Sequence, residues 1–154
     1  MEPRIKYTAP DKLPHWDTEG EFSLLIFDMN SLYVELQKHP ITHVTASDLA
    51  LSHRRALEQA LKNHQPIGMP IIRLTKDVEM DDMIDFFDGR HRTEFLHENG
   101  IKEMPAVVLT GQRDRMIAMG VAREPTPQEE HAIKTGLAFQ YLDNLYRNQE
   151  KWWR

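Results

Sequence analysis

The sharpest constraint on the fold is a change from strand to helix within a few residues. The apolar run Met83–Phe87 is typical of a buried strand and stops at Asp88. Gly89 then breaks the strand, because glycine adopts backbone conformations that other residues resist. Thr93–Asn99, closed by Gly100, has the pattern of a short helix with its C-cap. This succession predicts a tight β-to-α turn in a small domain that mixes strands and helices.

The side chains at this turn suit an anion. Arg90 and Arg92 offer paired N–H donors that match phosphate oxygens. His91 can donate to a phosphate or carry a proton near neutral pH. The backbone N–H groups of a helix that begins beside a glycine turn also attract anions. The spacing alone leaves a second interpretation open, a solvated charged loop that holds no ligand.

Length and composition limit the classes of protein that remain. The chain has 154 residues, 40% of them hydrophobic and 28% charged, which is typical of one globular domain. It contains no cysteine, so disulfides, thiolate catalysis and cysteine-based zinc sites are excluded. No apolar run approaches the roughly 20 residues that cross a bilayer, and the first residues lack the pattern of a secretory signal. We expect a cytoplasmic protein with no membrane insertion.

The charge balance restricts the kind of polyanion that the chain can bind. Its formal net charge is -5 and its calculated pI is about 5.9, which argues against coating nucleic acid through bulk electrostatics. Arginines nevertheless cluster at 54–55, 90/92 and 113/115. A phosphate site is therefore expected to be confined, which favours a nucleotide or one nucleic-acid end over a long duplex.

Hydrophobic periodicity divides the chain into a series of elements. Strands are expected over 22–28, 70–74, 83–87 and 104–109, and helices over 45–63, 93–99, 112–119 and 126–147. Residues 31–37 fit either a strand or a helical turn. Three regions are expected: an irregular N-terminal arm over 1–20, a core over 21–122, and a C-terminal amphipathic helix over 123–154 packed on that core.

Capping patterns mark the start of two of these helices. Thr45 with Asp48 three residues later resembles a capping box. Thr126 supplies an N-cap, Pro127 the first helical position and Glu129 the third. The last helix is therefore expected to begin sharply at Pro127.

At the turn, the sequence resembles a known superfamily. The run Phe87–Arg92, followed by a short helix and an apolar strand, is similar to the signature of the ParB/sulfiredoxin superfamily. Members pair an upstream Pro-Ile dipeptide, here Pro70–Ile71, with a G-x-[RH]-R turn that holds nucleotide phosphates. The D-G-R-H-R form of the turn resembles that of the plasmid fertility-inhibition (Osa-like) proteins. The resemblance covers 22–120 in element order, but only 68–108 in recognisable residues.

The resemblance implies an α+β fold, a small mixed sheet flanked by helices, with a long C-terminal helix. The residues that it implies for binding the phosphates of ATP or another nucleotide are Gly89, Arg90, His91, Arg92 and Thr93. Asp88 is implied to orient an arginine or to bind a metal such as Mg²⁺. Asp88, His91 and Arg92 are the catalytic candidates, and any hydrolysis is expected to need a divalent metal because no covalent nucleophile is evident.

The chain also departs from its better-known relatives. Sulfiredoxins carry their catalytic cysteine where this chain has Arg90, so repair of sulfinic acids is excluded. Chromosome-partition ParB proteins continue into DNA-binding and dimerisation domains, for which this chain has neither the length nor the basic character. We therefore expect a stand-alone nucleotide-binding core.

Other clusters of polar residues leave alternatives open. Asp81, Asp82 and Asp85 could join Asp88 around a cation, although a solvated acidic turn is the better account of the first two. Glu35, Asp28 and Glu94 are candidates for a general base, but they come from separate elements.

Three further groups lie outside the turn. His39 and His43 are four residues apart with Pro40 between them, which argues against a metal-binding pair. His53–Arg55 is interpreted as a solvated helix face, with a nucleic-acid groove as the alternative. Trp152–Trp153 either folds back on the core, marks a partner surface or is disordered.

Three functions remain open at this stage. The first is a plasmid fertility-inhibition-like protein that binds nucleotide or DNA phosphate at the turn, with ATPase or DNase activity unsettled, and that interferes with conjugative transfer. The second is a non-enzymatic module that docks on a conjugation, type IV secretion or DNA-processing component. The third is a nucleotide-dependent kinase or other NTPase. A carboxylate base near the turn would discriminate between them.

Overall fold

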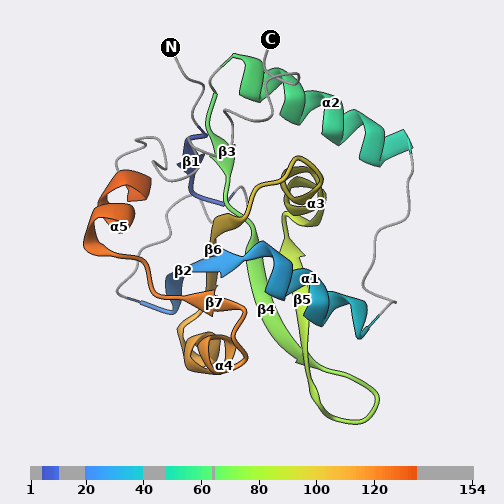
Figure 1. Cartoon of the computed structure of the whole chain (residues 1–154), viewed down its shortest axis with the longest axis vertical. Helices are drawn as coiled ribbons and strands as arrows, with labels where there is room; N and C mark the ends of the chain where they lie inside the picture. Colours follow the sequence, from blue (N-terminus) through green and yellow to red (C-terminus); the bar gives the residue numbers. More distant parts are fainter. Residues whose placement is uncertain (1–4, 11–19, 40–47, 64, 135–154) are drawn as a thin grey trace.

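The computed structural model describes residues 5–10, 20–39, 48–63 and 65–134. These residues form the expected α+β fold, a five-stranded mixed sheet flanked by helices, with a separate two-stranded sheet that pairs β1 with β3 (Figure 1). The elements in chain order are β1 (Tyr7–Thr8), β2 (Phe22–Asp28), α1 (Met29–Gln37), α2 (Asp48–Lys62), β3 (Ile67–Gly68), β4 (Ile71–Lys76), β5 (Asp82–Asp88), α3 (Arg90–Glu98), β6 (Glu103–Leu109), the 3₁₀ turn η2 (Thr110–Gln112), α4 (Arg113–Ala118), β7 (Ala122–Arg123) and α5 (Pro127–Lys134).

The strand order of the larger sheet is β5-β4-β6-β2-β7. β2 and β6 run antiparallel along their full length, from the pair Phe22 and Leu109 to the pair Asp28 and Glu103. β4 and β5 form an antiparallel hairpin, and β4 meets β6 in parallel at Ile71 and Val107. The start of β4 and the end of β5 therefore lie together on one side of the sheet, where α3 begins.

The two central strands carry the core. Leu24, Leu25, Ile26 and Phe27 of β2 are at most 4% exposed, as expected from this continuous apolar run. Ala106–Val108 of β6 are also fully buried. Strands that are buried on both faces have no alternation of polar and apolar residues, which explains why these two runs read so clearly in the sequence.

The ambiguous segment after β2 is helical. Asp28 caps α1, because its Oδ2 accepts a hydrogen bond from the Ser31 amide at 3.1 Å. Met29, Leu32 and Leu36 are buried at helical spacing, whereas Val34 is largely exposed. Residues 31–37 also fitted a strand because their apolar residues alternate. The Asp28 cap and the buried stripe of the helix stabilise the helical alternative.

The start of α5 follows the expected capping pattern. The Glu129 amide donates to Thr126 Oγ1 at 3.2 Å, and the Thr126 amide donates to the Glu129 carboxylate at 2.8 Å. Ile133 is buried against the core. The expected continuation of the helix to residue 147, and Trp152–Trp153, lie outside the described residues, as do Thr45 and His43.

The N-terminal arm is not wholly irregular. Within it, Ile5 and Tyr7 are almost completely buried, and β1 pairs in parallel with β3. Burial raises the pKa of the Tyr7 hydroxyl far above its usual range. Two-residue strands such as β1, β3 and β7 leave no readable periodicity, so the sequence did not predict them. No helix within the described ranges is long and apolar enough to cross a membrane.

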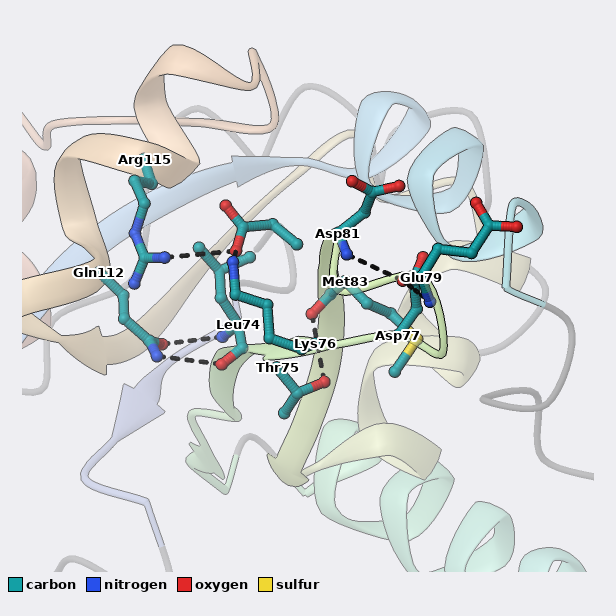
Figure 2. A network of polar contacts seen from close by, with 10 residues as sticks. Leu74, Thr75, Lys76, Asp77, Glu79, Asp81, Met83, Gln112 and Arg115 are labelled. Carbon is teal, nitrogen blue, oxygen red and sulfur yellow. Dashed lines mark hydrogen bonds and ion pairs between the residues drawn. The ribbon is translucent and has the colours of Figure 1, made fainter.

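A side chain completes the sheet where its strands separate. Beyond Ile71, β4 diverges from β6, and Gln112 from η2 fills the gap. Its Oε1 accepts from the Leu74 amide at 2.8 Å, and its Nε2 donates to the Leu74 carbonyl at 3.0 Å (Figure 2). The pairing imitates a neighbouring strand and satisfies the backbone of β4.

Candidate functional site

The turn between β5 and α3 is built around Gly89. Its φ is 90° and its ψ is 17°, a left-handed conformation that favours glycine. A Cβ at this position would lie 2.5 Å from the Cβ and 2.7 Å from the Cα of Pro70. Pro70 is itself fixed, because its carbonyl accepts a hydrogen bond from the Val107 amide at 3.0 Å. The Pro-Ile dipeptide thus packs directly against the glycine turn, and both features require glycine at position 89.

The helix after this turn begins earlier than expected. α3 starts at Arg90, not at Thr93, because the left-handed Gly89 serves as its N-cap. The Thr93 amide already donates to the Gly89 carbonyl at 3.0 Å, and the Thr93 hydroxyl donates to the same oxygen at 2.8 Å. Arg90, His91 and Arg92 therefore occupy the first turn, whose amides have no intrahelical acceptor. Within the described part of the chain, no side chain makes a capping hydrogen bond at this end of the helix.

Thr93 occupies a different place from the one expected. It is 0% exposed, and its hydroxyl is engaged by the carbonyl of Gly89. The side chain thus braces the turn from inside the fold. The three residues before it are partly exposed.

Each arginine of the turn is held by an acid on β5. Arg92 Nη2 lies 3.1 Å from Asp88 Oδ2, and Arg90 Nη2 lies 3.2 Å from Asp85 Oδ1. Asp85 also binds Arg73 on β4 at 3.1 Å. Asp88 therefore orients an arginine, which is one of the two roles expected for it. Among the described residues, no group of three or more His, Asp or Glu side chains could hold a metal ion.

Sequence reasoning missed the role of Asp85. Regular strand alternation puts Asp85 on the opposite face from Asp88. The register of β5 shifts by one residue between the pairs Ile72–Phe86 and Ile71–Asp88, however, and this bulge puts Asp85 and Asp88 on the same face, where Arg90 and Arg92 bind them. Each acid lies four or five residues before its arginine, with a glycine between them. This spacing was the signal in the sequence that could have predicted the ion pairs.

A cavity of about 520 Å³ opens beside the turn. α2 and α3 lie side by side (Figure 1), and both contribute residues to its lining. The lining residues are His53, Ala56, Leu57 and Ala60 of α2, Pro66, Ile67 and Gly68 before β4, and Asp88, Gly89, Arg90, His91 and Arg92 of the turn. One wall is thus mainly apolar and the other is cationic. All the turn residues predicted for the site except Thr93 line this cavity.

Two histidines meet at the cavity. The rings of His53 and His91 lie edge to face, with centroids 5.1 Å apart. Burial lowers the pKa of His91 below its usual 6.5, His53 and Arg90 add to this effect, and Glu94 opposes it. His53, interpreted from sequence as part of a solvated face, is exposed but also lines the cavity. Its neighbour Arg54 pairs instead with Glu98 on α3.

The guanidinium of Arg90 has unused hydrogen-bonding capacity. Its Nε is buried and has no hydrogen-bond partner in the described part of the chain. A buried donor without an acceptor is costly, and such groups often mark a site that a water, ion or ligand completes.

The other candidate acids are not among the residues that line this cavity. Asp28 caps α1, and Glu35 forms an ion pair with Lys38 at 2.8 Å. Asp82 lies at the far end of β5, where it binds Lys76 at 2.7 Å and Arg115 at 3.3 Å. Asp88 is the one carboxylate that lines the cavity within the described ranges.

Comparison with known proteins agrees with this fold. No protein-family model matches the chain, and no curated protein matches it. One solved structure is similar, with a TM-score of 0.51 and 14% sequence identity, over 93% of this chain and 76% of that one. It is the crystal structure of the Oncogenic Suppression Activity Protein, described as a plasmid fertility inhibition factor, in a gold(I) cyanide derivative. At this identity the likeness establishes a relation of fold between the two chains.

Proposed function

We propose that this chain binds the phosphate groups of a nucleotide at the N-terminus of α3, on a fold of ParB/sulfiredoxin type. The observation that carries the proposal is the turn at Gly89. The N-terminus of α3 has no side-chain cap among the described residues, and it adjoins a cavity that Arg90, His91 and Arg92 line. Helix N-termini and arginine forks are both suited to phosphate.

The shape of the cavity supports a nucleotide over a simple anion. Its volume of about 520 Å³ lies within the range of small-molecule sites. The wall formed by Ala56, Leu57 and Ile67 is apolar and suits a base or sugar, whereas the turn suits the phosphates. A ligand with one apolar and one polyanionic end matches both walls.

Each residue of the turn has a distinct role in this proposal. Arg90 and Arg92 neutralise phosphate charge, and Asp85 and Asp88 hold their side chains in place. His91 positions a phosphate oxygen or donates a proton to it. Thr93 contributes indirectly by fixing the carbonyl of the turn.

Mg²⁺ is compatible with this arrangement. It commonly binds through one or two carboxylates together with substrate phosphates and water. Asp88 supplies one carboxylate, with Oδ2 engaged by Arg92. Magnesium would here neutralise phosphate charge and position water for any hydrolysis.

ATPase or DNase activity is the second step of the proposal, after binding, with Asp88, His91 and Arg92 as the catalytic candidates. A kinase ranks lower because, among the residues that the structure describes, Asp88 is the one carboxylate that lines the cavity.

The likeness to a plasmid fertility inhibition factor suggests the process that this binding serves. We propose that the chain interferes with conjugative DNA transfer, through DNA or through a conjugation or type IV secretion component. Expression of the chain in donor cells should lower the frequency of plasmid transfer. An unchanged frequency, at verified protein levels and with several plasmid types, would remove this part of the proposal while leaving nucleotide binding intact.

One observation favours a second candidate, a docking module that keeps the turn only as scaffold. Both turn arginines are already paired with acids of the same chain, so the site is largely neutralised without a ligand. In this case the ion pairs stabilise the β5–α3 corner, and the protein acts through contacts with another protein.

Calorimetric titration discriminates between these candidates. ATP, CTP and a short single-stranded DNA are titrated with and without magnesium into the wild type and an Arg90→Gln/Arg92→Gln variant. Arg73→Gln is the matched control, because Arg73 also binds Asp85 but does not line the cavity. Binding that is lost only in the double variant supports the phosphate site. If well-folded wild type binds none of these ligands, the docking module becomes the better account.

A further inference from the structure

The loop between β4 and β5 projects away from the helices that flank the phosphate cavity (Figure 1). Val78 is 97% exposed and Met80 is 70% exposed at its tip. Single exposed apolar side chains are common on protein surfaces. Here two such side chains lie on one loop of five residues, and neither packs on the fold. Together they form a small apolar tip.

The loop holds a fixed shape. Oδ1 of Asp77 accepts hydrogen bonds from the amides of Glu79 at 2.8 Å and Asp81 at 2.9 Å (Figure 2). The Asp77 amide donates to the Asp81 carbonyl at 2.9 Å, and the Met80 amide donates to the Asp77 carbonyl at 3.0 Å. Such a loop presents its side chains without a large ordering cost on binding.

Met80 is in a strained conformation. Its φ is 65°, in the left-handed region that favours glycine. The methionine side chain in this strained position is 70% exposed, so it buries little apolar surface. Strained residues with no structural role are candidates for function. Methionine is also adaptable at binding surfaces, because its side chain is flexible and polarisable.

The charges beside the tip select the kind of partner. A cavity of about 840 Å³ lies between the loop and the end of α1. Its cations are already committed, since Lys76 binds Asp82 and Lys38 binds Glu35. The remaining lining residues include Glu79 and Asp81, which are exposed and have no ion pair with any residue that the structure describes.

We propose that this tip, residues 77–82 with the adjoining cavity, is a docking surface for a basic amphipathic segment of a partner protein. Apolar side chains of the partner pack on Val78 and Met80, and its lysines or arginines pair with Glu79 and Asp81. The net charge of -5 assists the approach of a cationic partner. The surface is separate from the phosphate cavity, so the inference does not depend on the proposed nucleotide.

The test uses an amidated peptide of alternating leucine and lysine pairs as the probe. Binding to the full chain is followed by ¹⁵N chemical-shift mapping, with a glutamate-for-lysine peptide as the comparison. Shifts are expected at residues 77–82 and at the end of α1, with the lysine peptide only. An Arg90→Gln/Arg92→Gln variant is expected to bind the peptide as the wild type does, which separates this proposal from the nucleotide site.

Two variants examine the two parts of the surface. Val78→Ser/Met80→Gly removes the apolar tip and relaxes the strained backbone, so it is expected to fold normally. Glu79→Gln/Asp81→Asn removes two charges but keeps the loop, whose turn uses the backbone of these residues. Each variant is expected to weaken peptide binding by about fivefold or more.

The matched control is Glu21→Gln/Glu130→Gln, which makes the same change of net charge on other elements. Equal loss of affinity in this control would mean that only overall charge matters, and would overturn the proposal. Shifts that avoid both residues 77–82 and the end of α1, or unchanged affinity in the Val78/Met80 variant, would overturn it too. Concentration-dependent dimers that depend on the tip would instead assign the surface to a second copy of this chain.

Discussion

Gly89 is subject to two independent restraints. Its left-handed φ disfavours a side chain, and Pro70 occupies the space that a Cβ needs. Gly120 offers a matched comparison, because its φ is 79° but a Cβ there would meet no atom of the described residues within 4 Å. Comparing the two positions separates backbone strain from steric overlap.

Gly89→Ala is expected to reduce the free energy of unfolding by about 2–4 kcal/mol, the sum of conformational strain and overpacking. Gly120→Ala is expected to lose only about 1 kcal/mol, from strain alone. Urea unfolding of both variants measures the difference. Equal losses would show that Pro70 yields to the added methyl group, and that the corner is less rigid than its contacts indicate.

His91 provides a prediction about pH. Its pKa is lowered by burial and by His53, so the folded chain releases this proton at a lower pH than the unfolded chain. Below about 6.5 the unfolded state therefore binds more protons, and stability falls as pH decreases through the window down to the folded pKa. Bound phosphate favours the protonated His91 ring. Nucleotide affinity is therefore expected to rise as the pH decreases through the same window.

NMR titration of the His91 ring follows this directly. The wild type is expected to titrate below 6.5, and His53→Gln is expected to raise the pKa of His91 because one repulsive charge is removed. A midpoint for His91 that does not move in His53→Gln would mean that the two rings are not coupled.

At the scale of elements, Gln112 replaces a missing strand partner for β4. Gln112→Ala removes both hydrogen bonds to Leu74, and is expected to cost about 1–3 kcal/mol because part-buried backbone groups lose their partners. Gln112→Glu keeps an acceptor for the Leu74 amide but loses the donor to the Leu74 carbonyl. Its free energy of unfolding is therefore expected to lie between those of the wild type and Gln112→Ala. Hydrogen exchange at the Leu74 amide should accelerate in Gln112→Ala alone. Unchanged exchange there would show that water replaces the glutamine.

The same scale shows how far the sequence predicts the fold. Long apolar runs such as Leu24–Phe27, and the local capping pattern at Thr126, were interpreted correctly because nearby residues determine them. The start of α3 was misplaced, since its first turn is polar and only the φ of Gly89 reveals the cap. The turn was found, but its pairing with Asp85 and its cavity wall at His53 depend on contacts between separate elements.

For the whole molecule, β5 separates two surfaces of different character. The phosphate cavity adjoins Asp88, the last residue of β5. The tip formed by residues 77–82 adjoins Asp82, the first residue of β5. Seven residues of strand span roughly 20 Å, which exceeds the Debye length at physiological salt. The acidic tip therefore does not cancel the local attraction at the turn, and it repels any polyanion long enough to reach both ends.

This arrangement predicts selection by ligand length. A mononucleotide is expected to bind with a shallow salt dependence, because its phosphates meet few cationic groups, Arg90 and Arg92 with His91. A duplex of about 30 base pairs is expected not to bind at about 150 mM salt. Calorimetry of the nucleotide over a salt series and gel retardation of the duplex provide the two measurements. Glu79→Gln/Asp81→Asn should leave the nucleotide affinity unchanged, since those acids lie at the other end of β5. Duplex binding with a steep salt slope would instead require an extended basic face, and would move the proposed function from a confined nucleotide pocket to DNA itself.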